Sequence, residues 1–140
     1  MAVNAPELNR PTDIMGARGT VALAAYRLVK LVVSGTDMYA DYPAAQFAWT
    51  FGVTRHAITT AGDMCDIIYG GIALVQVDGN AANIAIGDSI TAHDATGYGQ
   101  KAAGGAAATR PCIGVALAAS TADGDIIPVR LSQHGVYFAA

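Results

Sequence analysis

Three histidines and a few closely spaced aspartates are the residues of this chain best suited to bind a metal. The histidines, His56, His93 and His134, show neither His-x-His nor His-x-x-x-His spacing. A zinc site would therefore have to be assembled from distant parts of the chain. Asp123 and Asp125 flank a glycine, but too few oxygen ligands accompany them for calcium. We expect no metal or cofactor site.

A thiol nucleophile is the other chemistry that the sequence allows, with Cys65 beside His56 and Asp63. No nucleophile motif surrounds Cys65, and the alternation of its segment places it on the inward face of a strand. A cysteine there serves as a small buried hydrophobic residue. We therefore expect no enzymatic activity. Cys65 and Cys112 are too few for a disulfide framework, although a single bridge between them stays open.

Composition argues against nucleic-acid and membrane partners. The net charge is -3, and the basic residues are scattered instead of forming the stripe that neutralises phosphates. The most apolar stretch, residues 21–33, is interrupted by Arg27 and Lys30 and is shorter than a membrane-spanning helix. The first residues lack the charged and apolar regions of a secretory signal, so we expect none. Cys65 and Cys112, used as small buried hydrophobic residues, are typical of a protein made in a reducing cytoplasm.

The balance of charged and apolar residues indicates association. Only 14% of the residues are charged, whereas 53% are hydrophobic. A typical globular domain is about 25% charged. So few charges cannot cover the surface of a small monomer, and large exposed apolar patches mark interaction sites. We expect part of the surface to be buried against other subunits.

An internal repeat organises the chain at an offset of 62 residues. The matched positions are Gly52-Val53 with Gly114-Val115, Gly62-Asp63 with Gly124-Asp125, Gly35 with Gly97, and Leu28 with Ile90. After each Gly-Asp pair, apolar residues alternate with polar or mixed ones, as in a half-buried strand. Further strands are expected at residues 27–33, 72–77 and 88–92, separated by turns.

These patterns predict an all-β fold. We expect a compact β-sandwich or barrel of short strands, built from two pseudo-repeats at residues 21–71 and 83–133 within a single domain, residues 21–140. An alanine-containing segment at residues 42–46 allows at most one short helix. Residues 1–20, broken by prolines and glycines, form an extended N-terminal arm. Two interpretations of this arm stay open: a disordered tail, or a segment that orders against a neighbouring subunit.

Two segments near the C-terminus carry a resemblance to a known family. Residues 110–119, RPCIGVALAA, are followed by residues 124–131, GDIIPVRL. Their order and spacing resemble the C-terminal signature of small phage capsid decoration proteins, also called cement or head-stabilising proteins. Residues 27–31 and 70–75 look like the first and middle strands of the same family. The resemblance covers residues 21 to about 133 and not the N-terminal arm.

The resemblance implies a non-enzymatic virion protein on the outer surface of a phage head. It implies binding to the major capsid protein, self-association as a homotrimer, and stabilisation of the head by bridging of neighbouring capsomers. From the composition, we expect no direct contact with nucleic acid or a membrane. The alternative function is a virion-surface adhesin that binds host glycans through exposed aromatic residues such as Tyr42, Trp49 and Tyr98.

Candidate interface residues come from the arm and from an aromatic stretch in the first repeat. Simpler members of the family look plainer at the position of that stretch. It is either an interface patch or a local core cluster, since aromatic residues are favoured in both. The candidate interface residues are Pro6, Leu8, Pro11, Ile14, Met15, Tyr39, Tyr42 and Trp49.

Overall fold

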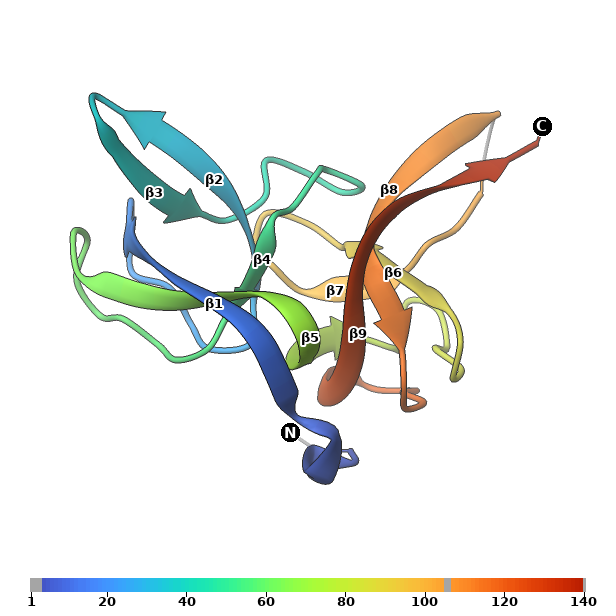
Figure 1. Cartoon of the computed structure of the whole chain (residues 1–140). Coiled ribbons are helices and arrows are strands. Elements are labelled where there is room, and N and C mark those ends of the chain that lie inside the picture. The colour runs from blue at the N-terminus through green and yellow to red at the C-terminus, as the bar shows by residue number, and fades with distance from the viewer. Residues whose placement is uncertain (1–3, 105–106, 140) are drawn as a thin grey trace.

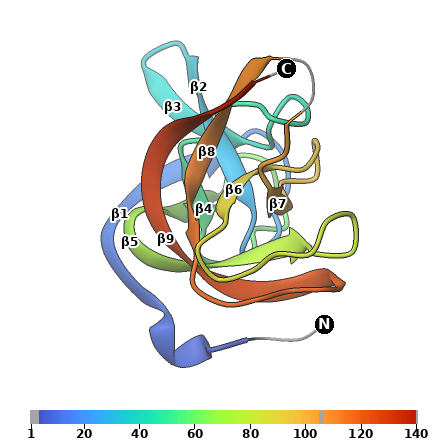
Figure 2. The same cartoon turned by 90° about the vertical axis from the view of Figure 1, so that its right-hand side faces the viewer.

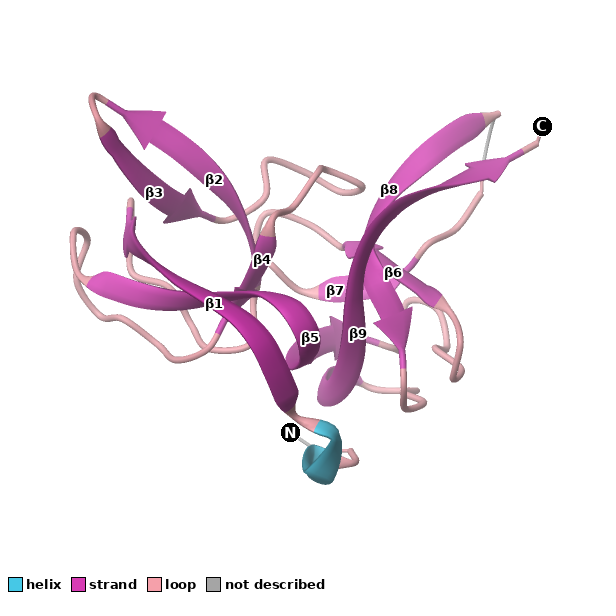
Figure 3. Cartoon of the chain, viewed as in Figure 1, coloured by secondary structure: helices cyan, strands magenta, loops and turns pink. Residues whose placement is uncertain are grey.

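The computed structural model describes residues 4–104 and 107–139, and over these residues the protein is all-β, as predicted (Figure 3). The elements are η1 (Pro6–Leu8), β1 (Arg10–Gly19), β2 (Leu28–Ser34), β3 (Asp37–Asp41), β4 (Gly52–Thr54), β5 (Met64–Asp78), β6 (Ser89–Ala92), β7 (Gly99–Lys101), β8 (Ala108–Ala116) and β9 (Asp123–Phe138). The segment considered for a helix, residues 42–46, forms bends and turns instead.

The strands close into two rings that share the long strand β5. The sheet order is β1-β3-β2-β4-β5-β7-β6-β8-β9, and additional pairings join β1 to β5 and β5 to β9. The first unit therefore comprises β1, β3, β2, β4 and residues 64–72 of β5. The second unit comprises residues 72–78 of β5 with β7, β6, β8 and β9. Figure 1 shows β5 running from one unit into the other.

The two units have the same topology. In the first unit β1 pairs in parallel with β3, and in the second unit β5 pairs in parallel with β7. Every other pairing within each unit is antiparallel. The sequence repeat is thus a repeat of a five-stranded ring, with one strand serving as the last of the first ring and the first of the second.

The matched glycines explain why the repeat is visible in the sequence. A Cβ atom on Gly52 or on Gly114 would lie closer than 3.0 Å to the backbone carbonyl oxygen of Ile68 or Arg130 respectively. Those two carbonyls are themselves 62 residues apart. Each glycine therefore allows the close approach of two strands that any side chain would prevent.

The offset between corresponding residues of the two units is not 62 in the strands that precede these glycines. Val29 pairs with Gly52 in the first unit, and Ile90 pairs with Gly114 in the second. Ile90 is therefore the counterpart of Val29, and the match of Leu28 with Ile90 is wrong by one residue. The loops that join the strands differ in length between the units, and a gapless comparison cannot follow that difference.

Among the described residues, two clusters of buried side chains form the core. The smaller cluster lies within the first unit and consists of Ala17, Leu23, Val29, Ala40, Ile58, Cys65 and Ile67. The larger cluster contains the core of the second unit, including Val75, Ile90 and Ile127. It also takes in Leu28, Val53 and Ile68 of the first unit. These three neighbouring residues from β2, β4 and β5 join the two units by apolar contact.

The N-terminal segment is extended and pairs within its own chain. Residues 10–18 form an antiparallel ladder with residues 64–72 of β5, so β1 closes the first ring. Ahead of it, the Asn4 amide donates a hydrogen bond to the Ile126 carbonyl at 2.8 Å. Residues 1–3 of the expected arm lie outside the described residues.

Three segments project on one side of the molecule, opposite the N-terminus. They are the β2–β3 turn, the loop that joins β3 to β4, and the paired outer ends of β8 and β9 (Figure 1). Figure 2, turned by 90°, shows the β2–β3 turn and the outer ends of β8 and β9 on that same side. Strand ends that extend beyond the rings present unpaired edges, which are common sites of association.

Candidate interface surfaces

The predicted interface residues have different environments. Trp49 is 63% exposed and Ile14 is 39% exposed. Leu8, Pro11, Met15 and Tyr39 are half-buried, and nothing is described of the Pro6 side chain. These residues come from different elements: Ile14 and Met15 lie on β1, and Trp49 lies in the β3–β4 loop.

Trp49 is exposed because the loop that carries it is held against the second unit. The Phe47 amide donates to the Ala92 carbonyl at 3.0 Å, and Gln133 Nε2 donates to the Thr50 carbonyl at 2.6 Å. The Arg110 guanidinium lies 3.9 Å from the centroid of the Phe47 ring. Phe47 therefore fixes the loop by a cation–π contact, while Trp49 in the same loop is exposed.

Two other aromatic residues of this stretch have structural roles. The Tyr42 hydroxyl accepts a hydrogen bond from the Ala24 amide at 2.9 Å, and its ring packs on the core of the first unit. Phe51 packs on the same core, with its ring centroid 5.2 Å from that of Tyr69. The stretch thus divides into anchored residues and one exposed residue, Trp49, a division that spacing alone does not reveal.

Sequence reasoning missed several exposed apolar residues. They are Val21, Val33, Met38, Met64, Tyr69, Ile86 and Tyr137. Val33 lies on the projecting β2–β3 hairpin and Tyr137 near the projecting end of β9. Period-2 alternation identifies the apolar face of a strand but not where the strand leaves the core. That limit explains why these residues were not singled out.

A groove opens between β1 and β3, where the two strands diverge. Their pairing is limited to Arg18 with Tyr39 and Gly19 with Ala40. The groove measures about 310 Å³ and is lined by Met15, Gly16, Ala17, Arg18, Asp37, Met38 and Met64. Methionine is a flexible side chain that adapts to varied partners, and three methionines line this groove.

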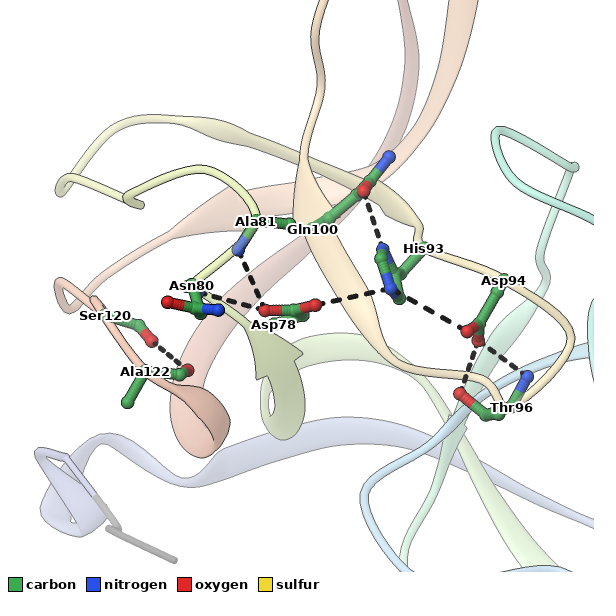
Figure 4. A network of polar contacts seen from close by, with 9 residues as sticks. All are labelled: Asp78, Asn80, Ala81, His93, Asp94, Thr96, Gln100, Ser120 and Ala122. Carbon is green, nitrogen blue, oxygen red and sulfur yellow. Dashed lines mark hydrogen bonds and ion pairs between the residues drawn. The ribbon is translucent and has the colours of Figure 1, made fainter.

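A polar network lies at the junction of the two units (Figure 4). His93 Nε2 lies 3.3 Å from Asp78 Oδ2 and 3.7 Å from Asp94 Oδ2, and its Nδ1 lies 2.8 Å from Gln100 Oε1. Asp78 Oδ1 also accepts hydrogen bonds from two backbone amides of the turn that follows β5. The network therefore ties the loop after β6 to the end of β5.

Asp94 is stabilised in its charged form within this network. Burial acts to raise its pKa, but hydrogen bonds from the Thr96 hydroxyl and amide, together with His93 and Arg27, outweigh burial and lower the pKa below the ordinary value. The interactions that lower this pKa stabilise the folded state at pH values above the pKa that Asp94 has in the unfolded chain. This stabilisation is lost as the pH falls through the pKa that Asp94 has in the folded protein.

Arg27 links this network to the first unit. Its Nε donates to Gln76 Oε1 at 3.0 Å and its Nη1 to the Thr96 carbonyl at 2.7 Å. Its guanidinium lies 4.3 Å from the centroid of the Tyr98 ring. It lines a polar hollow of about 320 Å³ with Asp78, His93, Asp94, Thr96, Tyr98 and Asp123. Tyr98 is therefore engaged in the junction.

Replacing Arg27 should weaken the junction measurably. We expect Arg27→Ala to lower the free energy of unfolding by about 2 kcal/mol, because two charge-assisted hydrogen bonds and a cation–π contact are lost. Chemical denaturation followed by circular dichroism measures this. The matched control is Arg55→Ala, whose 3.9 Å ion pair with Asp66 is largely exposed, so a change below about 0.5 kcal/mol is expected. Equal effects of the two substitutions would contradict the role of Arg27.

The residues of the thiol hypothesis are not arranged as a nucleophile and base. The Cys65 thiol is buried and donates to the His56 carbonyl at 3.3 Å, while His56 Nε2 accepts from the Asp66 amide at 3.3 Å. Burial raises the pKa of Cys65, and burial raises that of Cys112 to about 11, so both favour the neutral thiol. The two cysteines are free, and no bridge joins them.

Comparison with known proteins shows a likeness to a solved structure. No family model and no curated protein matches the chain. Among solved structures, it is similar to "The crystal structure of head fiber gp8.5 N base in bacteriophage phi29". The two share 16% sequence identity at a TM-score of 0.65, over 86% of this chain and 93% of that chain. The fold is shared with a phage head-fibre base.

The likeness includes parts of both units, because it covers 86% of this chain. At this identity it establishes the fold, while function rests on the surfaces described above. Within residues 4–104 and 107–139, no three His, Cys, Asp or Glu side chains lie close enough together to hold a metal ion. The described part of the chain also contains no helix with the length and apolar character needed to span a membrane.

Proposed function

We propose that this chain is a non-enzymatic structural protein of a phage virion that decorates the outer surface of the head. It binds the major capsid protein as a homotrimer and stabilises the shell by bridging neighbouring capsomers. It acts in the virion after synthesis in the host cytoplasm. The observation that carries this proposal is the fold shared with a phage head-fibre base over 86% of the chain.

The surface supports an attachment role. Apolar side chains project from the ends of the β2–β3 hairpin and the β8–β9 ribbon and from the β3–β4 loop, where Val33, Trp49 and Tyr137 are each more than 60% exposed. Burial of apolar area on a lattice favours binding, and a small gain per copy adds up over many copies. The mechanism is mechanical: each bound protomer must be released before the joint that it covers can open.

Binding to capsids tests the proposal directly. Expanded heads of the encoding phage, prepared without this protein, are mixed with the purified chain and sedimented. We expect the chain to co-sediment and to raise the temperature at which the heads disrupt. The double substitution Trp49→Ala with Tyr137→Ala should reduce binding, whereas Arg55→Ala, away from these segments, should not. Failure of the unsubstituted protein to bind heads would overturn the proposal.

The second candidate is a glycan-binding adhesin, which the exposure of Trp49 favours because aromatic faces stack on sugars. Tyr42 and Tyr98 do not add to such a site, since one is anchored to Ala24 and the other lies under Arg27. Glycan binding that is lost in Trp49→Ala, together with absence of head binding, would favour the adhesin.

A further inference from the structure

We propose that two copies of this chain associate through different surfaces. The second unit of one copy docks against the methionine-lined groove in the first unit of the other copy. The docking surface on the second unit is the counterpart of the surface by which, within the chain, the first unit contacts the second. Each contact between chains would then repeat the contact that already exists within the chain. The inference rests on the self-association proposed above and is independent of capsid binding.

The joint within the chain has two parts. A segment of the first unit, residues 24–28, lies along the second unit: the Tyr26 carbonyl accepts from the Gln76 amide at 2.8 Å, and the Leu28 amide donates to the Gly97 carbonyl at 2.7 Å. Beside it, Leu28, Val53 and Ile68 are buried with the core of the second unit. The joint thus combines backbone hydrogen bonds with an apolar row.

The second unit contains the same segment in the same conformation. Tyr26 and Gly87 both have positive φ, 62° and 94°, and their amides donate to the Thr54 and Ala116 carbonyls, each at 2.9 Å. By this register Ile86 stands where the first unit has Ala25. In the first unit Leu28 pairs with Val53, which pairs with Ile68. In the second unit the residues at the corresponding positions are Ser89, Val115 and Arg130, which pair in the same way.

Among the described residues this corresponding surface, which we call the tail surface, is partly exposed, and Ser89 Oγ lies 2.9 Å from His134 Nε2 of β9. It consists of Ile86, Ser89, Val115 and Arg130. Ile86 is 71% exposed, Arg130 is exposed, and Ser89 and Val115 are half-buried. Leu28, Val53 and Ile68 are instead at most 3% exposed. The difference arises because the first unit has a neighbour at this position and the second unit does not.

The surface of the second unit that contacts residues 24–28 also has a counterpart in the first unit. The second unit receives the segment at residues 24–28 beside β5 and β7, its parallel strand pair. The corresponding pair in the first unit is β1 and β3, and between them lies the open groove lined by Met15, Met38 and Met64. We call this groove the head surface. Within the described chain, the edge of residues 10–17 of β1 that faces the groove pairs with no strand.

The two free surfaces suit one another. Ile86 is a large apolar side chain on a turn, and the groove offers flexible methionine side chains that can close around it. Because head and tail are different surfaces, the contact is heterologous, so it generates a closed ring or an open chain according to the rotation between copies. Continuity with the joint inside the chain identifies the occupant as a second copy.

Complementation between two variants tests this inference. Met38→Asp with Met64→Asp places charges in the head surface, and Ile86→Asp places one on the tail surface. All three residues are exposed, so folding should be unaffected, which circular dichroism and thermal melting verify. Solution mass is then measured for the unsubstituted protein, for each variant alone and for their equimolar mixture. Tyr137→Asp, on the β9 ribbon, is the control.

The unsubstituted protein and Tyr137→Asp should have the mass of an oligomer, and each variant alone should have the mass of one protomer. The mixture should give a species of two protomers, because the intact head surface of one variant can still bind the intact tail surface of the other. A monomeric unsubstituted protein, a variant that keeps its oligomeric mass, or a mixture that stays monomeric would overturn the inference. Binding to phage capsids is measured in a separate experiment, so either proposal can fail alone.

Discussion

Gly114→Ala is expected to destabilise the protein by about 3 kcal/mol, a large share of the stability of a typical domain. A Cβ atom at this position would collide with the backbone carbonyl of Arg130, and a carbonyl fixed in a strand ladder cannot move aside as a flexible side chain can. The strands β8 and β9 would have to separate where their pairing closes the second ring. Urea denaturation followed by circular dichroism measures the loss.

The repeat supplies a parallel experiment and a control. Gly52→Ala should cause a loss of similar size, because its Cβ would meet the carbonyl of Ile68 in the same way. Gly16→Ala should change the free energy of unfolding by less than about 1 kcal/mol, because the nearest atom is the sulfur of Met64 at 3.1 Å, at the end of a flexible side chain. If all three substitutions had equal effects, close strand approach would not be the reason for the matched glycines.

Ala17→Asp is expected to abolish folding of the first unit, with a loss of more than about 4 kcal/mol. Ala17 is 2% exposed and lies in the core of the first unit with Val29 and Cys65. A carboxylate there finds no cation in the cluster, since the residues that form it are apolar. We expect the variant to accumulate as insoluble protein or to show reduced strand content by circular dichroism.

This substitution also distinguishes a closing strand from a tail. Thr12→Lys, at an exposed position of the same strand, should leave the melting temperature almost unchanged. If β1 were dispensable for the fold, Ala17→Asp would be as harmless as Thr12→Lys. A large difference in stability between these two variants, whose substitutions lie five residues apart, would show that the strand has a buried face.

The turn and close-approach glycines were the most reliable guide in the sequence. Gly62 and Gly124 both have positive φ, as do Gly35 and Gly97, so these four matched glycines adopt a backbone conformation that other residues rarely adopt. Such requirements are local and few residues satisfy them, which is why they persist as a visible pattern. The inward position of Cys65 was also predictable, because alternation along a strand is a local property.

The surfaces were less predictable. Ile14 and Trp49 proved exposed, but Tyr42 is anchored to Ala24, and exposed residues such as Ile86 and Met64 were missed. Whether an apolar residue is covered depends on the neighbour that the fold brings to it. Leu28 and Ser89 illustrate this, because they occupy corresponding strand positions and only Leu28 has a second unit beside it.

The sequence by itself determined that this protein is all-β and internally duplicated, because strand periodicity and glycine conformation depend on residues close together in the chain. Only the tertiary structure decided that β5 serves both rings, that residues 10–19 form the strand closing the first ring, and that, among the described residues, the groove beside β1 is open and Ile86 is exposed. These features depend on pairings between residues far apart in the chain, such as β1 with β5 and β5 with β9. Such pairings leave no periodic signal in the sequence, since either partner would look the same with another strand beside it.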